Sequence, residues 1–243
     1  GTERIVHLQG EVITDDAGRS QRMLGTVQDV TDKRATEAKI YFLANYDGLT
    51  HLPNRSLFLH RMAQAITCGM GTDVIGAVLV LSLDRYQRIN DMYGLRNGDQ
   101  MLKEVTGRFQ RALSTGTTLA QFAGADTTML ARLGEDQFAA LLTNLPTAED
   151  SAKVAQSLLT SLGTPFQIGN ATMTLTANIG IAIPGTDGTE ADPLLHNAVT
   201  ALQTAKSRGH SNYQYYSGSM NVSIAARVAL EQDLRAALTA NQF

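Results

Sequence analysis

The segment Leu130–Leu142 (LARLGEDQFAALL) constrains the fold of this chain more than any other. Two apolar runs flank a tight corner made by Gly134, Glu135 and Asp136. Strand-like runs joined by a short Gly/Asp corner are typical of a β-hairpin. The sequence therefore places adjacent polar residues at a hairpin tip, where at least one carboxylate faces solvent or a ligand.

Other periodic segments surround this hairpin. Gly76–Leu83 (GAVLVLSL) is a continuous apolar run, typical of a strand buried on both faces. The order of helices and strands along the chain predicts an α+β fold. In this α/β sandwich, helices flank one central, mostly antiparallel sheet. The other expected elements are helices 56–66, 100–113, 148–162 and 191–208, and strands 173–183 and 213–216.

Composition limits the function classes. With 243 residues, 43% hydrophobic residues and a net charge of −3, we expect a soluble globular chain with one substantial core. The slightly acidic balance gives no reason to expect nucleic acid as a partner. The single cysteine excludes an internal disulfide framework and indicates a reducing, cytoplasmic location. No apolar run approaches the ~20 residues of a membrane span.

Both ends of the sequence look like pieces of larger units. Residues 3–13 and 22–30 are strand-like, and two strands alone cannot bury a core. A helix is expected over 32–45, either as a solvated connector or as a signalling coiled coil. A last helix is expected over 220–241.

Several separated motifs resemble the GGDEF family, the diguanylate cyclases that join two GTP molecules into cyclic di-GMP. The hairpin tip reads GEDQF where the family has GGDEF, and Asp47–Arg55 (DGLTHLPNR) resembles DxLTGLPNR. The segment that begins at Ser82 resembles DxDxFKxIND. Several motifs in one order are more specific than one short match. The resemblance implies a nucleotidyl cyclase (palm-like) fold and an Asp47–Arg55 ion pair that tethers the loop.

The resemblance extends to the flanking segments. It implies a PAS–GGDEF–EAL type bacterial signalling protein, whose own downstream EAL phosphodiesterase domain is the expected partner and lies outside this sequence. The implied divisions are the C-terminal remnant of a PAS domain at 1–31, a signalling linker helix at 32–46, the GGDEF domain at 47–217, and a connector helix toward the EAL domain at 218–243.

The family's metal ligands are only partly kept. The reaction needs a divalent metal to offset phosphate charge and activate the attacking hydroxyl, and Mg²⁺ prefers hard oxygen ligands. The family's first aspartate is replaced by Ser82, while the second is present as Asp84. In the signature Asp136 is kept and Gln137 replaces glutamate. We therefore expect a weakened Mg²⁺ site with Asp84 and Asp136 as the remaining ligands.

Glu135 adds an independent objection to catalysis. The family has glycine there because the backbone passes close to the nucleotide, and close approach is what glycine permits. A glutamate brings bulk and negative charge toward a triphosphate. The resemblance therefore assigns the catalytic signature to Glu135, Asp136 and Gln137 and predicts that it is degenerate, without cyclase activity.

The nucleotide-binding positions are better kept. Asn90 and Asp99 match the family's guanine-contacting residues, although Asn90 could instead start a turn and Asp99 could cap the following helix. Lys206 matches a phosphate-contacting lysine, His210 stands where the family has arginine, and Gln87 replaces a lysine. GTP is thus expected to bind loosely, without a requirement for metal.

Three functions remain open at this level. The first is a silent GGDEF module that regulates a downstream EAL phosphodiesterase and senses GTP. The second is an active diguanylate cyclase whose atypical metal site uses Asp84 and Asp136. The third is a dimerisation scaffold with no nucleotide role. Family logic favours a homodimer, because a two-fold-symmetric product is assembled at an isologous interface.

Overall fold

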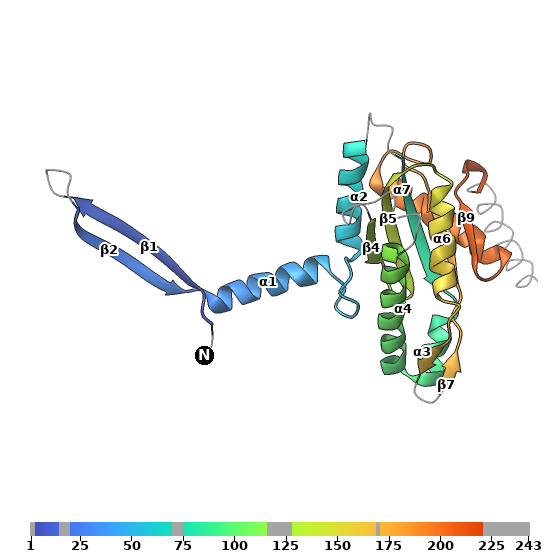
Figure 1. The fold of residues 1–243 in the computed structure, drawn as a ribbon, viewed down its shortest axis with the longest axis horizontal. Helices are drawn as coiled ribbons and strands as arrows, with labels where there is room; N and C mark the ends of the chain where they lie inside the picture. Colours follow the sequence, from blue (N-terminus) through green and yellow to red (C-terminus); the bar gives the residue numbers. More distant parts are fainter. Residues whose placement is uncertain (1–2, 15–19, 70–74, 116–127, 169–170, 221–243) are drawn as a thin grey trace, which may run out of the picture. The chain divides into compact units, whose positions relative to one another are not determined.

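The chain forms two units. Contacts between Cα atoms divide it into Gly1–Tyr46 and Asp47–Phe243. The computed structural model (Figure 1) describes residues 3–14, 20–69, 75–115, 128–168 and 171–220. The expected connector helix therefore lies almost wholly outside the described residues. Within the described residues, no helix is both long and apolar enough to cross a membrane.

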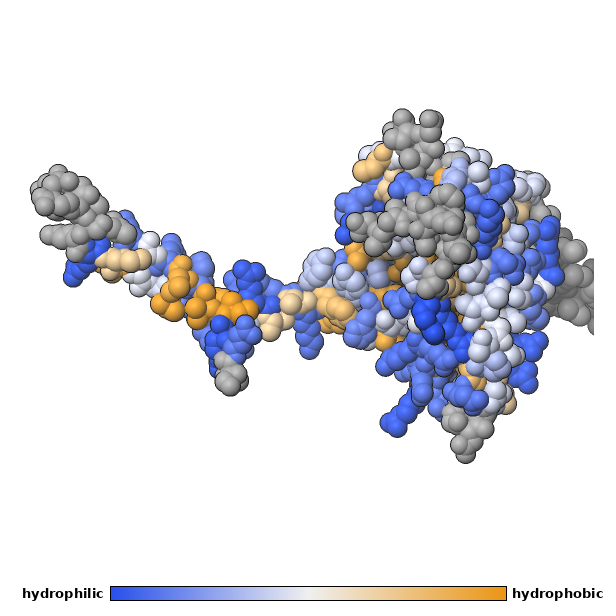
Figure 2. Space-filling model, in the orientation of Figure 1, coloured by the Kyte–Doolittle hydropathy of each residue, from blue (hydrophilic) through white to orange (hydrophobic). Residues whose placement is uncertain are grey.

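The first unit is a hairpin followed by a helix. Strands β1 (Val6–Thr14) and β2 (Ser20–Asp29) pair antiparallel, and α1 (Thr31–Asn45) follows. No residue of α1 is buried, and the apolar side chains along the hairpin lie at the surface (Figure 2). The most exposed of these are Leu8, Met23 and Val27. Two strands form no core of their own here, as physical reasoning requires.

A five-stranded sheet organises the second unit. Its order is β4-β5-β3-β8-β9, and only the β8–β9 pair is parallel. The predicted α+β fold with one central, mostly antiparallel sheet is therefore confirmed. The strands are β3 (Ile75–Leu83), β4 (Thr128–Arg132), β5 (Gln137–Leu145), β8 (Ala177–Ala182) and β9 (Asn212–Tyr215).

Helices cover both faces of this sheet. The flanking helices are α2 (Arg55–Gly69), α3 (Tyr86–Tyr93), α4 (Leu95–Thr115), α6 (Asp150–Ser161) and α7 (Ala191–Arg208). Helices α4 and α6 run side by side on one face (Figure 1). Successive β3 side chains point to opposite faces. Leu79 and Leu81 join the cluster under α4 and α6, whereas Val78 and Val80 join the one under α2 and α7. This double burial explains the uninterrupted apolar run.

Two predicted boundaries were wrong. The expected helix 100–113 begins earlier, at Leu95, because Gly94 adopts a positive φ of 80° and its carbonyl oxygen accepts from the amides of the new first turn. The expected strand 173–183 is broken: β7 (Ala171–Met173) pairs with β6 (Phe166–Ile168), and β8 starts only at Ala177.

Strand β8 packs closely against α7 because Gly180 has no side chain. A Cβ atom there would lie 2.0 Å from the Ala198 carbonyl oxygen and 2.3 Å from the Leu202 amide nitrogen. We expect Gly180→Ala to lower the free energy of unfolding by about 3 kcal/mol, because backbone on both sides must move apart. Urea denaturation measures this change.

The control is Gly107→Ala in the middle of α4, where an added Cβ meets no atom within 4 Å outside the helix backbone. That variant should gain about 0.5–1 kcal/mol from helix propensity. Equal stabilities for the two variants would contradict the packing argument.

Candidate functional site

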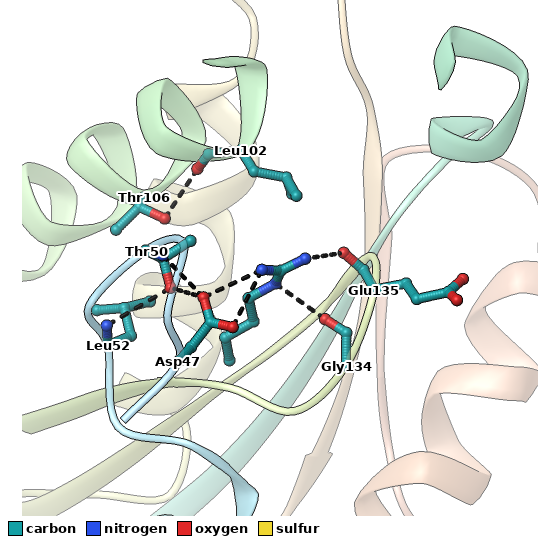
Figure 3. Close-up of polar contacts among 8 residues, drawn as sticks. Asp47, Thr50, Leu52, Leu102, Thr106, Gly134 and Glu135 are labelled. Carbon is teal, nitrogen blue, oxygen red and sulfur yellow. Dashed lines mark hydrogen bonds and ion pairs between the residues drawn. The ribbon is translucent and has the colours of Figure 1, made fainter. Parts of the chain in front are cut away.

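Arg132, the last residue of β4, holds the hairpin corner to the loop that precedes α2. Its Nη1 donates to both Asp47 carboxylate oxygens, at 3.0 and 3.2 Å, and its Nε and Nη2 donate to the carbonyl oxygens of Gly134 and Glu135. Its backbone N–H donates to the Pro53 carbonyl oxygen. Figure 3 shows Asp47, Gly134 and Glu135 converging on the guanidinium group, with the Glu135 carboxylate directed away from it.

This network corrects the expected ion pair. Asp47 pairs with Arg132, which is 85 residues away in sequence, whereas Arg55 is exposed at the start of α2. Burial opposes ionisation of Asp47, but hydrogen bonds from Thr50 and the Arg132 guanidinium outweigh it and lower its pKa. His51 takes a positive φ of 59° in the same loop, which is why glycine is usual there.

Two candidate ligand positions, Ser82 and Asp136, form a hydrogen bond with each other. In the register of β3 and β5, Ser82 lies opposite Gln137, next to the hairpin tip. The fully buried Ser82 hydroxyl donates to Asp136 Oδ2 at 2.5 Å. The serine thus takes one acceptor site of the carboxylate and leaves fewer for a metal ion.

Asp84, the other candidate carboxylate, is engaged on the opposite side, toward β8. Its Oδ2 accepts from the Thr176 hydroxyl at 2.6 Å, and its Oδ1 accepts from Asn178 Nδ2 at 2.9 Å. His210 Nδ1 lies 3.1 Å from Asp84 Oδ2. These contacts fix the carboxylate, which is only 10% exposed, as part of the β3–β8 junction.

The structure brings several predicted residues around one hollow. Its volume is about 370 Å³, and it lies at the ends of β3 and α7 beside the hairpin tip. The predicted site residues in its wall are Asp84, Glu135, Asp136, Lys206 and His210. Gln87 also lines it, as do Arg85 and Asn178, which the sequence did not single out.

Asn90 and Asp99 do not line the hollow themselves, but they lie near the hydroxyl of Tyr86, which does. Burial raises the pKa of Tyr86, and the nearby Asp99 and Asp136 carboxylates raise it further, whereas Asn90 opposes the shift. Asn90 Oδ1 is buried and has no hydrogen-bond partner among the residues that the structure describes, and the absent side chain of Gly98 leaves it room. Asp99 lies inside α4, so the expectation that it caps that helix was wrong.

Sequence reasoning missed Tyr86, Thr176 and Asn178. Tyr86 stands at the phenylalanine position of DxDxFKxIND and precedes Asn90 by four residues, so helical spacing places both on one face. That spacing was the available signal. Thr176 and Asn178 alternate with buried apolar residues at the start of β8, and no local pattern indicates that they reach Asp84.

The oxygen donors do not fit a magnesium site. A magnesium ion bound by protein usually takes one or two free carboxylates together with phosphate and water. Here one Asp136 oxygen accepts from Ser82, and the two Asp84 oxygens accept from Thr176, just before β8, and from Asn178 in β8. Among the residues that the structure describes, no three His, Cys, Asp or Glu side chains gather as metal ligands would.

Comparison with known proteins identifies the class. The profile described as "Diguanylate cyclase, GGDEF domain" matches residues 44–212. The chain is 36% identical to the bifunctional diguanylate cyclase/cyclic di-GMP phosphodiesterase MucR and 32% identical to the cyclic di-GMP phosphodiesterase NbdA, both of Pseudomonas aeruginosa. These matches cover 83% and 85% of this chain, but only 28% and 25% of the two relatives.

Solved structures agree with this assignment. The GGDEF domain of TpbB (YfiN) from Pseudomonas aeruginosa superposes with a TM-score of 0.66 at 28% identity, covering 74% of this chain and 99% of that one. An EAL/GGDEF domain protein from M. capsulatus is 35% identical, with a TM-score of 0.54, and covers 68% of this chain and 99% of that one. The chain therefore belongs to the GGDEF family of cyclic di-GMP signalling domains.

The Asp47–Arg132 pair predicts a pH-dependent contribution to stability. We expect Asp47→Asn to lower the free energy of unfolding by about 2 kcal/mol at pH 7, because Arg132 loses its buried counter-charge. Because the pKa of Asp47 is lower in the folded state than its ordinary value of 3.8, the ionised carboxylate stabilises the folded protein above pH 3.8. This stabilisation disappears as the pH falls through the folded-state pKa. Urea denaturation at pH 7 and below pH 3.8 measures both states.

Arg55→Gln is the control, because Arg55 was the partner expected from the sequence. It should change stability by less than about 0.5 kcal/mol. A difference between wild type and Asp47→Asn that stays constant down to acidic pH would show that the ionised carboxylate contributes nothing.

Proposed function

We propose that this domain is a catalytically silent GGDEF module that regulates a downstream EAL phosphodiesterase. The observation that carries the proposal is the hydrogen bond from the Ser82 hydroxyl to Asp136. It engages one oxygen of the one carboxylate kept in the signature, while Asp84 is held by Thr176 and Asn178. Cyclase chemistry needs carboxylates free for metal at this position.

The relatives support a neighbouring phosphodiesterase. MucR and NbdA carry this activity in their names, and the chain spans about a quarter of the length of each. In this proposal the segment 1–31 is the end of a PAS sensor domain, and α1 transmits its state to the GGDEF domain. The exposed apolar side chains of the first unit support a hairpin that completes a larger sheet.

GTP is the ligand that we propose for the silent domain, bound chiefly through its base. The buried Asn90 Oδ1 needs a donor, and a guanine N–H would supply one. Lys206 and His210 line the hollow toward which the phosphates would extend. Because the carboxylates there are already engaged, this binding requires no magnesium.

Calorimetric titration with GTP tests the sensing role. We expect weak binding of similar affinity with and without Mg²⁺, and Asn90→Ala should weaken it about tenfold by removing the base contact. Gln203→Ala, an exposed change on α7, is the control and should bind as wild type does. No heat of binding in either condition would remove GTP from the proposal and leave a nucleotide-independent scaffold.

Restoration of the lost ligands tests the silent state. We expect the triple variant Ser82→Asp, Glu135→Gly, Gln137→Glu to produce cyclic di-GMP from GTP and Mg²⁺, and the unmodified protein to produce none. Chromatography of the reaction mixture measures the product. Adding Asp136→Asn to the triple variant is the control and should abolish turnover.

Product from the unmodified protein would overturn the silent state and favour the active cyclase with an atypical metal site. If the triple variant is folded but inactive, the lost lysine at Gln87 or the replaced arginine at His210 limits the site as well.

A further inference from the structure

A second hollow lies beside the candidate site, and the function proposed above makes no use of it. Its volume is about 480 Å³, and its wall is formed by α3 and by the segment that joins β7 to β8. It shares Asp84, Arg85 and His210 with the hollow at the hairpin tip, whereas its other lining residues belong to it alone. Hollows of this size suit small organic molecules.

Apolar side chains form one part of this wall. Ile89 and Leu175 belong to the core and are 5% and 3% exposed. Met173 is partly buried against the same core, whereas Met92 is 62% exposed. Thioether side chains adjust to irregular shapes and contact aromatic rings favourably. This part of the wall therefore suits the apolar or aromatic body of a ligand.

Two arginines give the wall a net positive charge. Arg85 precedes α3 and Arg88 lies in its first turn, and both line the hollow. Both are exposed, and in the described part of the chain neither forms an ion pair. Among the described residues of the wall, the one carboxylate is that of Asp84, which is 10% exposed and already accepts hydrogen bonds from Thr176 and Asn178. Guanidinium groups bind phosphate and carboxylate through paired N–H donors, so the wall favours an anion.

The backbone between β7 and β8 adds hydrogen-bonding groups. Thr174 and Leu175 line the hollow and lie outside both strands. Among the described residues, no hydrogen bond between helices, strands and loops involves the backbone N–H or carbonyl group of either one. Buried backbone groups are nearly always paired in native proteins. A ligand in the hollow would thus give this segment hydrogen-bond partners that the described part of the chain does not supply.

We propose that this second hollow binds a small organic anion, in which a phosphate or carboxylate group is attached to an apolar or aromatic body. The anionic group pairs with Arg85 and Arg88, and the body packs against Ile89, Met92 and Met173. Both halves of the ligand contribute, because an inorganic anion leaves the apolar side chains uncovered and a neutral molecule leaves the arginines without a counter-charge. The proposal does not depend on GTP binding, since neither Arg88 nor the apolar side chains take part in it.

Titration of the isotope-labelled full chain with naphthyl phosphate, followed by nuclear magnetic resonance, tests the proposal. We expect saturable shifts of the backbone amide signals of residues 88–92 and 173–176, with a dissociation constant of about 1 mM or below. Inorganic phosphate and naphthol, the two halves of this probe, should each bind at least about tenfold more weakly. Naphthoate distinguishes the two anionic groups: tighter binding of naphthyl phosphate assigns the hollow to phosphate esters, and tighter binding of naphthoate assigns it to carboxylates.

Substitutions outside the nucleotide hollow locate the probe. Arg88→Gln should weaken the binding of naphthyl phosphate about tenfold, and Met92→Gln about threefold, because they remove the counter-charge and the exposed apolar contact. Arg61→Gln on α2 is the matched control, since it removes an exposed positive charge elsewhere and should leave the dissociation constant unchanged.

Three results would overturn the proposal. The first is the absence of any shift up to about 10 mM naphthyl phosphate. The second is equal affinity of the wild type and Arg88→Gln. The third is a set of shifts confined to residues 134–137, which would place the probe at the hairpin tip.

Discussion

The Ser82 hydroxyl and the Asp136 carboxylate meet where β3 ends and β5 begins, and this hydrogen bond ties the signature to the central sheet. Ser82 is fully buried, so its hydroxyl would cost about 1–3 kcal/mol if it had no partner. Asp136 satisfies it from the hairpin tip. The position that the family resemblance assigns to a metal ligand thus holds a hydrogen-bond donor, and this donor engages one oxygen of Asp136.

The retained carboxylates consequently have structural reasons to remain. Asp84 joins β3 to β8 through Thr176 and Asn178, and Asp47 joins the loop before α2 to β4 through Arg132. Each replaces hydration by several hydrogen bonds, so each stabilises the fold whether or not GTP reacts. Retention of an acidic residue at a catalytic position is therefore weak support for catalysis in this domain.

The fold was largely predictable, whereas the site was predictable only in part. The apolar run of β3, the hairpin around Gly134 and the helical periodicities fix element types, because local pattern and tertiary burial agree there. The sequence could not reveal that Arg132 replaces Arg55 as the partner of Asp47, since both are arginines and only the contact of β4 with the loop before α2 decides between them. It also could not show that Asn178 would reach Asp84, a contact between strands far apart in sequence.

At the hairpin tip, Glu135 alters the charge that a ligand would meet but leaves the backbone conformation unchanged. The described non-glycine residues with positive φ are His51, Arg85, Asn144 and Ser211, so Glu135 takes an ordinary backbone conformation. Glutamate therefore replaces glycine there without backbone strain. Its exposed carboxylate would repel a bound polyphosphate but does not disturb the fold. Its charge adds to those of Asp84 and Asp136 around a hollow whose permanent cations are Arg85 and Lys206. In the function that we propose, a nucleotide would meet electrostatic repulsion from these carboxylates rather than a damaged fold, and its recognition would fall to the base side near Asn90.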